Sequence, residues 1–150
     1  MFNLRNRNRA LENWLVTVGL LLAVFGVVMA VSSDSHLFRL IFDPLIESRF
    51  WPGDLPPEAE RFRAWVYGAW GGTVAGFGLL MTAIARPAIS GGNKRLRLSA
   101  LAALVVWFVV DSAASLGYGA WGNAVFINLP TLLALGLPLL LARDRQVDIE

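Results

Sequence analysis

One acidic side chain, Asp111, stands deep inside an apolar stretch, where it follows Val109 and Val110 and precedes Ser112. Placing an ionised carboxylate in the hydrocarbon of a bilayer costs about 2.5–3.5 kcal/mol, so such a group needs a reason to be there. Asp111 is therefore expected to face other protein groups or water, or to carry a proton. It is the residue around which the chemistry of this chain is most readily built.

Polar residues from three apolar segments fall at a similar depth. On its own helix, Asp111 shares a face with the residues four and seven positions later. At a rise of about 1.5 Å per residue, polar residues of two other segments lie within roughly one turn of Asp111 in depth. We expect a hydrogen-bonded cluster that lines a pocket open toward the outer side. It comprises Asp111, Ser115, Asn128 and Thr73, with Tyr118 and Asn123 nearer the mouth.

Three roles are open for this cluster: hydrogen bonding between helices, a ligand or ion site, and catalysis. Polar side chains that join membrane helices contribute about 0.6–2 kcal/mol each, and this role is the commonest. A lone acid without a second titratable partner lacks the usual means of general acid–base catalysis. No catalytic residue is predicted, and enzymatic activity is disfavoured. Trp107, one turn below Asp111 on the same face, is either the floor of the pocket or a core side chain.

The sequence lacks the residues that several other chemistries require. It has no cysteine and a single histidine, His36, outside the apolar segments, so we expect no metal site and no cofactor. It contains no phosphate-binding loop and no dinucleotide fingerprint. The formal net charge is +2, but the basic residues stand at the ends of apolar segments, where they indicate membrane topology. We therefore expect no binding of nucleic acid.

The elements that must position these residues are apolar helices. Hydrophobic residues make up 56% of the chain and its mean hydropathy is +0.56, values too high for a soluble domain of 150 residues. Four stretches are each long enough to cross a hydrocarbon core about 30 Å thick. We predict one all-α domain, a bundle of four transmembrane helices. Its spans lie at about 10–31, 64–85, 98–118 and 124–142.

The basic residues also predict the orientation of the bundle. If the amino terminus is inside, nine of the 13 lysines and arginines fall on the cytoplasmic side and four fall outside. This asymmetry favours a multi-pass inner-membrane protein with both termini in the cytoplasm. The nine are Arg5, Arg7, Arg9, Arg86, Lys94, Arg95, Arg97, Arg143 and Arg145, and the four are Arg39, Arg49, Arg61 and Arg63.

The outer loop before the second span predicts an additional short helix. In residues 34–51, apolar side chains are interspersed with charged ones, a pattern typical of an amphipathic helix in the headgroup region. We expect an interruption at Asp43-Pro44, because proline cannot donate a helical hydrogen bond. The segment either acts as a lid over the pocket or packs over the outer ends of the bundle.

Three glycines recur every four residues in the second span, at Gly68, Gly72 and Gly76. Small residues in that register let another helix approach closely. The partner is either another helix of the same chain, which we favour, or a second copy of the protein in a homodimer.

Two prolines interrupt the last span. Pro130 and Pro138 are expected to bend this helix and to leave the carbonyls of Phe126 and Ala134 without their helical donors.

Residues 104–112, followed by Ser115-Leu116-Gly117-Tyr118-Gly119 and then by Asn123 and Asn128, resemble a family of small, uncharacterised bacterial inner-membrane proteins with four transmembrane helices. The similarity includes Phe50-Trp51 and Tyr67-Gly68. It supports the four-span architecture and the choice of Asp111, and it implies no activity, substrate or cofactor.

The leading hypothesis is a membrane protein without catalytic activity, surrounded by lipid, that binds a small molecule, a lipid or a partner helix near Asp111. A proton-coupled transporter that titrates Asp111 is one alternative, and it would require a dimer. A lipid-modifying enzyme is another, and it would require a second ionisable group. The first span brings no polar residue to the depth of Asp111, so we expect it at the periphery of any pocket.

Overall fold

The computed structural model describes residues 4–51, 53 and 55–143. Side chains 37 and 43 and the predicted cytoplasmic Arg145 lie outside this description. All regular secondary structure in the described ranges is helical. In chain order the elements are α1 (Leu4–Ser32), α2 (His36–Leu45), the 3-10 turn η1 (Glu47–Arg49), α3 (Pro57–Ala88), α4 (Lys94–Gly117), the π-helical η2 (Asn123–Asn128) and α5 (Leu129–Leu141).

Four of these helices are long and apolar enough to cross a membrane: α1, α3, α4 and the continuous helix formed by η2 and α5. The protein is an all-α membrane bundle of four helices, as the sequence predicts. Both α1 and α3 begin before the predicted spans. The early start of α3 follows from Pro57, because proline suits the first position of a helix, where an N–H has no helical partner.

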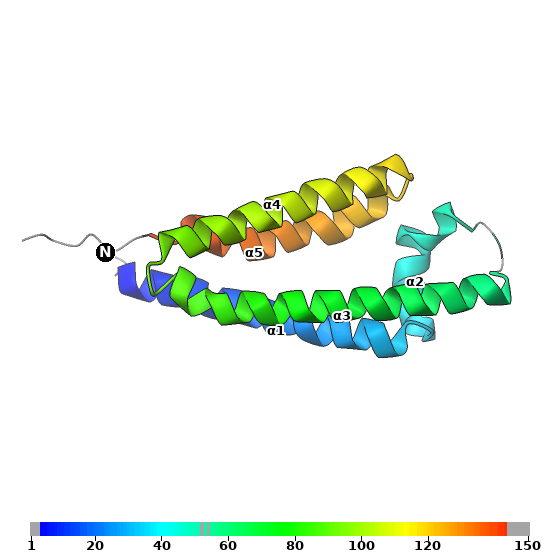
Figure 1. Cartoon of the computed structure of the whole chain (residues 1–150), viewed down its shortest axis with the longest axis horizontal. Helices are drawn as coiled ribbons and strands as arrows, with labels where there is room; N and C mark the ends of the chain where they lie inside the picture. Colours follow the sequence, from blue (N-terminus) through cyan, green and yellow to red (C-terminus); the bar gives the residue numbers. More distant parts are fainter. Residues whose placement is uncertain (1–3, 52, 54, 144–150) are drawn as a thin grey trace, which may run out of the picture.

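Helices α1 and α3 form the closest pair and lie side by side over most of their length (Figure 1). A Cβ atom added at Gly71 of α3 would lie 2.5 Å from the backbone oxygen of Gly26 in α1. One added at Gly19 would lie 2.7 Å from the backbone oxygen of Gly78. Because only hydrogen fits at these four positions, the two backbones approach closely, which strengthens packing in lipid.

The contact uses a different glycine register from the predicted one. Nothing lies within 4 Å of a Cβ atom added at Gly68, Gly72 or Gly76. The preference for an internal partner at these three positions is therefore wrong. Positions 71 and 78 are seven residues apart, which returns them to one side of the helix after about two turns, whereas Gly72 is rotated about 100° from Gly71.

The second helix pair is α4 with the helix of η2 and α5. Figure 1 shows the two pairs close together at the end that carries the amino terminus and farther apart toward α2. The apolar core lies where the pairs meet, and Leu15, Met81, Leu104, Leu135 and Leu139 are at most 2% exposed there. This core leaves the opposite half of the bundle free to hold the polar residues of α4.

The predicted amphipathic helix is α2, which packs over the end of the bundle away from the amino terminus (Figure 1) through two phenylalanines. Phe38 and Phe42 stack with ring centroids 4.2 Å apart, and both meet the ring of Tyr67 on α3 edge-on. The predicted interruption at Asp43-Pro44 is wrong, because α2 continues to Leu45 with Pro44 inside its last turn. A proline there removes only one bond near the end of the helix.

A buried ion pair fixes the loop that follows α2. Arg63 of α3 donates to Glu47 Oε2 at 3.0 Å, and both side chains are at most 9% exposed. Arg63 also reaches Asp34 at 3.2 Å, although that carboxylate is 68% exposed. These bonds hold the residues just before and just after α2 against the start of α3.

Candidate functional site

Asp111 lies in α4 at the centre of a hydrogen-bond network. Its Oδ1 accepts from Ser115 Oγ at 3.2 Å, from Asn123 Nδ2 at 2.8 Å and from Asn128 Nδ2 at 2.7 Å. The serine is on the same helix, and the two amides come from η2. The network therefore joins α4 to the last span, and three donors engage one oxygen of the carboxylate.

The turn after α4 brings the chain back toward Asp111. The helix ends in a Schellman motif, in which Ala120 N–H donates to Ser115 O at 2.8 Å and Gly119 N–H donates to Leu116 O at 3.1 Å. Gly119 has a φ of 76°, a conformation that glycine adopts without steric cost. The chain reverses within a few residues, and η2 starts beside the end of α4.

The π-helical turns of η2 then direct both asparagines to the same carboxylate. Residues five apart in an α-helix, such as Asn123 and Asn128, point about 140° away from each other. The wider π-helical pattern, with Leu129 N–H bonded to Ala124 O five residues earlier, reduces that angle. Pro130 follows directly and has no N–H for an α-helical bond. Near Pro130 the last span is therefore π-helical, whereas the sequence predicted a bend there.

The two amides use both of their N–H groups within the network. Asn123 Nδ2 also donates to Ser115 Oγ at 2.8 Å, and Asn128 Nδ2 donates to Ser112 Oγ at 3.1 Å. Turning either amide round would direct its oxygen at the carboxylate, so the orientation of both is fixed. Asn123 is 4% exposed, and its Oδ1 is consequently buried without a hydrogen-bond partner.

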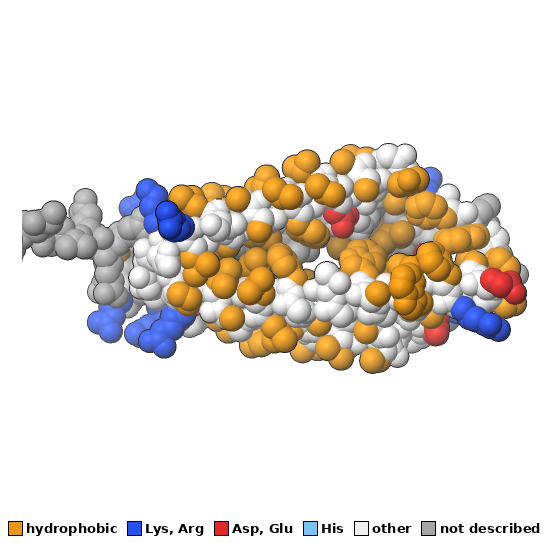
Figure 2. Space-filling view, in the orientation of Figure 1, with side chains coloured by type: hydrophobic (Ala, Val, Ile, Leu, Met, Phe, Trp, Pro, Cys, Tyr) orange, Lys and Arg blue, Asp and Glu red, His pale blue; other side chains and the backbone are white. Residues whose placement is uncertain are grey.

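A cavity of about 600 Å³ lies beside this network, between α4, the turn after it, α3 and the segment after α2. Figure 2 shows the surface hollowed between the second half of α4 and the end of the bundle that carries α2. Asp111, Ser115 and Asn123 line one wall. The second carboxylate oxygen, Asp111 Oδ2, accepts no hydrogen bond from any described residue and is not buried. It is the accessible polar atom of this wall.

The rest of the cavity is apolar and aromatic. Trp70 comes from α3, Trp107 from α4, and Phe50 from the segment after α2. Tyr118 stands at the exposed rim, 73% exposed, with its ring centroid 6.2 Å from that of Phe50. The lining contains no lysine, arginine or histidine. A single carboxylate thus provides the charge of an otherwise apolar cavity.

The structure brings together most, but not all, of the residues that the sequence placed here. Asp111, Ser115 and Asn128 are bonded as expected, and Asn123 joins them directly instead of standing at the mouth. Thr73 is not part of the network, because its hydroxyl donates to Ala69 O of its own helix at 3.1 Å. The prediction used only depth along the helix, and depth does not determine in which direction around the helix axis a side chain points.

Thr73 lines a second, neighbouring cavity of about 460 Å³, together with Asn128 and residues of α1 such as Phe25. Trp107 lines both cavities and also packs on Phe77, so the two roles considered for it coexist. No residue of α1 lines the first cavity, but Leu22, Phe25 and Met29 of α1 line the second, so the expectation that α1 stays at the periphery of any pocket does not hold there.

Two contacts escaped the sequence analysis. Ser112 is buried and accepts from Asn128, a role that its position next to Asp111 could have suggested. Trp14 of α1 donates from its indole nitrogen to Ala134 O at 2.9 Å. That carbonyl was expected to lack its helical donor because Pro138 stands four residues later. The proline was therefore a usable signal for a donor from another helix.

The chain matches no protein-family model, no curated protein and no solved structure. The resemblance to small bacterial four-span proteins thus stays a prediction, and the function must be argued from the site.

Proposed function

We propose that this protein binds a small amphiphilic molecule, or the head of a lipid, in the cavity beside Asp111. The observation that carries the proposal is an incomplete polar wall. Asp111 Oδ2 is accessible and accepts no hydrogen bond from any described residue, although Oδ1 of the same carboxylate accepts three. A carboxylate oxygen in apolar surroundings gains from a hydrogen bond, so a donor from outside the chain would stabilise this arrangement.

The size and lining of the cavity support the same proposal. Ligand pockets commonly measure about 300–1,000 Å³ and combine apolar walls with a few convergent polar groups. The cavity of about 600 Å³ has this composition, with Asp111, Ser115 and Asn123 facing Ile46 and Phe50. Hydrogen bonding between helices does not require such a space, because the bonds that join α4 to η2 use Asp111 Oδ1 and the hydroxyls of Ser112 and Ser115, and not Asp111 Oδ2.

The experiment compares two phenylalanine substitutions on α4. Ala114→Phe adds a ring inside the cavity, whereas Ala113→Phe adds the same ring at an exposed position outside the cavity lining. Protein purified in mild detergent is analysed by native mass spectrometry for a retained small molecule. We expect the wild type and Ala113→Phe to carry it and Ala114→Phe to lose it. Equal retention in both variants, or no retained molecule and no thermal stabilisation by added lipid extract, would overturn the proposal.

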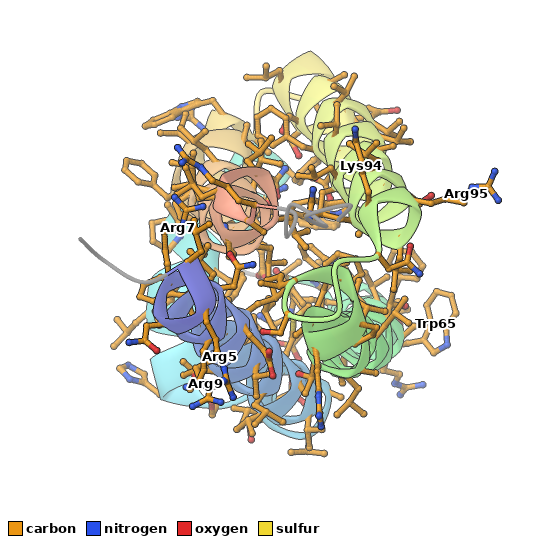
Figure 3. The ribbon with its side chains drawn as sticks, turned by 90° about the vertical axis from the view of Figure 1, so that its left-hand side faces the viewer. Arg5, Arg7, Arg9, Trp65, Lys94 and Arg95 are labelled. Carbon is orange, nitrogen blue, oxygen red and sulfur yellow. The ribbon has the colours of Figure 1, made fainter. Side chains whose placement is uncertain are left out.

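We also propose that the protein lies in a bacterial inner membrane with both termini in the cytoplasm. Figure 3 views the bundle from one end, at which Arg5, Arg7 and Arg9 of α1 and Lys94 and Arg95 of α4 gather. This gathering supports the orientation, since basic residues are enriched on the cytoplasmic side.

Because the chain has no cysteine, single introduced cysteines can test the orientation. An impermeant maleimide should label Ser48→Cys in intact spheroplasts and Ser90→Cys only after lysis. The reverse pattern would contradict the orientation.

A homodimer through Gly68, Gly72 and Gly76 is a further proposal. It is supported by the open space over these three glycines, which leaves their side of α3 uncovered within the chain. In a dimer, Gly72→Leu should shift the detergent-solubilised protein toward the monomer. Ala103→Leu, an exposed position on α4, is the matched control. An unchanged oligomeric state in Gly72→Leu would count against the interface.

A further inference from the structure

We infer that the ligand of the Asp111 cavity is a lipophilic amine: a protonated primary or secondary ammonium group on an apolar body. This inference rests on the proposed function and names its ligand class. The groups that define the class are the accessible oxygen of Asp111 and the aromatic side chains of the cavity.

The hydrogen-bond pattern of the wall around Asp111 indicates that the head group of the ligand is a hydrogen-bond donor. All four amide hydrogens of Asn123 and Asn128 are already committed to Asp111, Ser115 and Ser112. The accessible atom without a partner at this wall is an oxygen, Asp111 Oδ2. An ammonium group carries several N–H donors and no acceptor, so it can donate to this oxygen. A carboxylate or phosphate head would instead meet acceptors only.

The uncompensated carboxylate of Asp111 indicates that the ligand is a cation. Asp111 forms no salt bridge with any described residue, and the cavity lining contains no basic side chain. An ionised carboxylate in apolar surroundings gains most from a counter-ion, because the attraction is little screened there. Since the chain supplies none at this wall, the cation must come with the ligand.

The aromatic lining suits the same head and an apolar body. Trp70, Trp107 and Tyr118 line the cavity, and their ring faces attract cations. Val106 and Val110, one turn apart on α4, add an aliphatic surface beside Asp111. A molecule with an ammonium at one end and an alkyl chain at the other would place its charge at Asp111 and its chain against the apolar side chains.

The test titrates the purified wild-type protein with four ligands that share a decyl chain, each below its micellar concentration. They are decylammonium, decyltrimethylammonium, decanol and decanoate. Isothermal titration calorimetry measures the four affinities. Decylammonium should bind at least about tenfold more tightly than each of the others, the factor expected for one charge-assisted hydrogen bond. Equal affinity for decanol or decanoate would overturn the inference.

Two carboxylate variants locate the binding. Asp111→Asn should weaken decylammonium binding at least about tenfold. Glu12→Gln replaces a carboxylate in the first third of α1, outside the cavity lining, and should leave binding unchanged. If Asp111→Asn does not fold, Ala114→Phe should abolish binding by filling the cavity. Undiminished decylammonium binding in a folded Asp111→Asn variant would refute the inference.

Two sources can supply such a head, a free amine or phosphatidylethanolamine. Nanodiscs of phosphatidylcholine with and without phosphatidylethanolamine distinguish them, because the second lipid competes with decylammonium only if its ammonium enters the cavity. Failure of the inference can be told from failure of the proposed function. If Ala114→Phe still loses a retained molecule but the decyl series shows no preference for ammonium, the cavity binds a ligand of another class.

Discussion

The close contact between α1 and α3 predicts that adjacent glycines respond in opposite ways to the same substitution. An alanine at Gly71 would place its Cβ atom 2.5 Å from Gly26 O and 2.7 Å from Ala30 N. An alanine at Gly72 would meet nothing within 4 Å. Contacts of carbon with backbone atoms need about 3.4 Å or more. The helices must therefore separate by close to 1 Å around Gly71 and need not move at Gly72.

The magnitude follows from comparing the two variants. Both replace glycine by alanine in the middle of one helix, so the gain in helix propensity of about 1 kcal/mol is common to both. What remains is the steric cost at Gly71, which overpacking places at about 1–3 kcal/mol. We expect Gly71→Ala to be less stable than Gly72→Ala by this amount. Gly72→Ala itself should equal or exceed the wild type.

The assay is reversible unfolding in mixed micelles, with helix content followed by circular dichroism, on the wild type and both variants. A double variant with Gly78→Ala should cost less than the sum of the single changes, because the helices have already moved apart. Equal unfolding free energies for Gly71→Ala and Gly72→Ala would refute the close contact. So would a larger loss at Gly72.

Three further predictions concern polar contacts. Trp14→Phe should cost about 0.5–1.5 kcal/mol in the wild type and little in a Pro138→Ala background, which restores the helical donor to the carbonyl that Trp14 serves; a double-mutant cycle measures this coupling. Glu47→Gln should destabilise the fold by about 3–5 kcal/mol because it breaks a buried ion pair, and Asp34→Asn by less than about 1 kcal/mol because that carboxylate is 68% exposed; thermal unfolding ranks the two. Asn128→Ala removes two hydrogen bonds between α4 and η2 and should cost about 1–3 kcal/mol of unfolding free energy; a change below about 0.3 kcal/mol would contradict the network as a structural element.

The polar network explains how a carboxylate is accommodated so far inside a span. Its Oδ1 is stabilised within the protein by Ser115, Asn123 and Asn128, which offsets part of the cost of burial. The cavity leaves Oδ2 accessible. One oxygen of the carboxylate, Oδ1, thus joins the helices, and the other, Oδ2, stays accessible from the cavity. We assign Oδ2 to the ligand.

The sequence by itself determined the number and type of the helices, because apolar length is a local property of the chain. It also identified Asp111, since a charged group in such a segment is costly wherever the helix packs. The bonds with Ser115 and Asn128 were accessible too, one from helical spacing and the other from depth.

Only the tertiary structure decided which side of each helix faces which neighbour. Depth along an axis can be counted from the sequence, but rotation about it depends on packing, and one residue changes that rotation by about 100°. This is why Thr73 was placed in the network and lies outside it, and why Gly72 was chosen for the contact that Gly71 makes. The π-helical turns that bring Asn123 to Asp111 likewise depart from the regular spacing on which sequence reasoning relies.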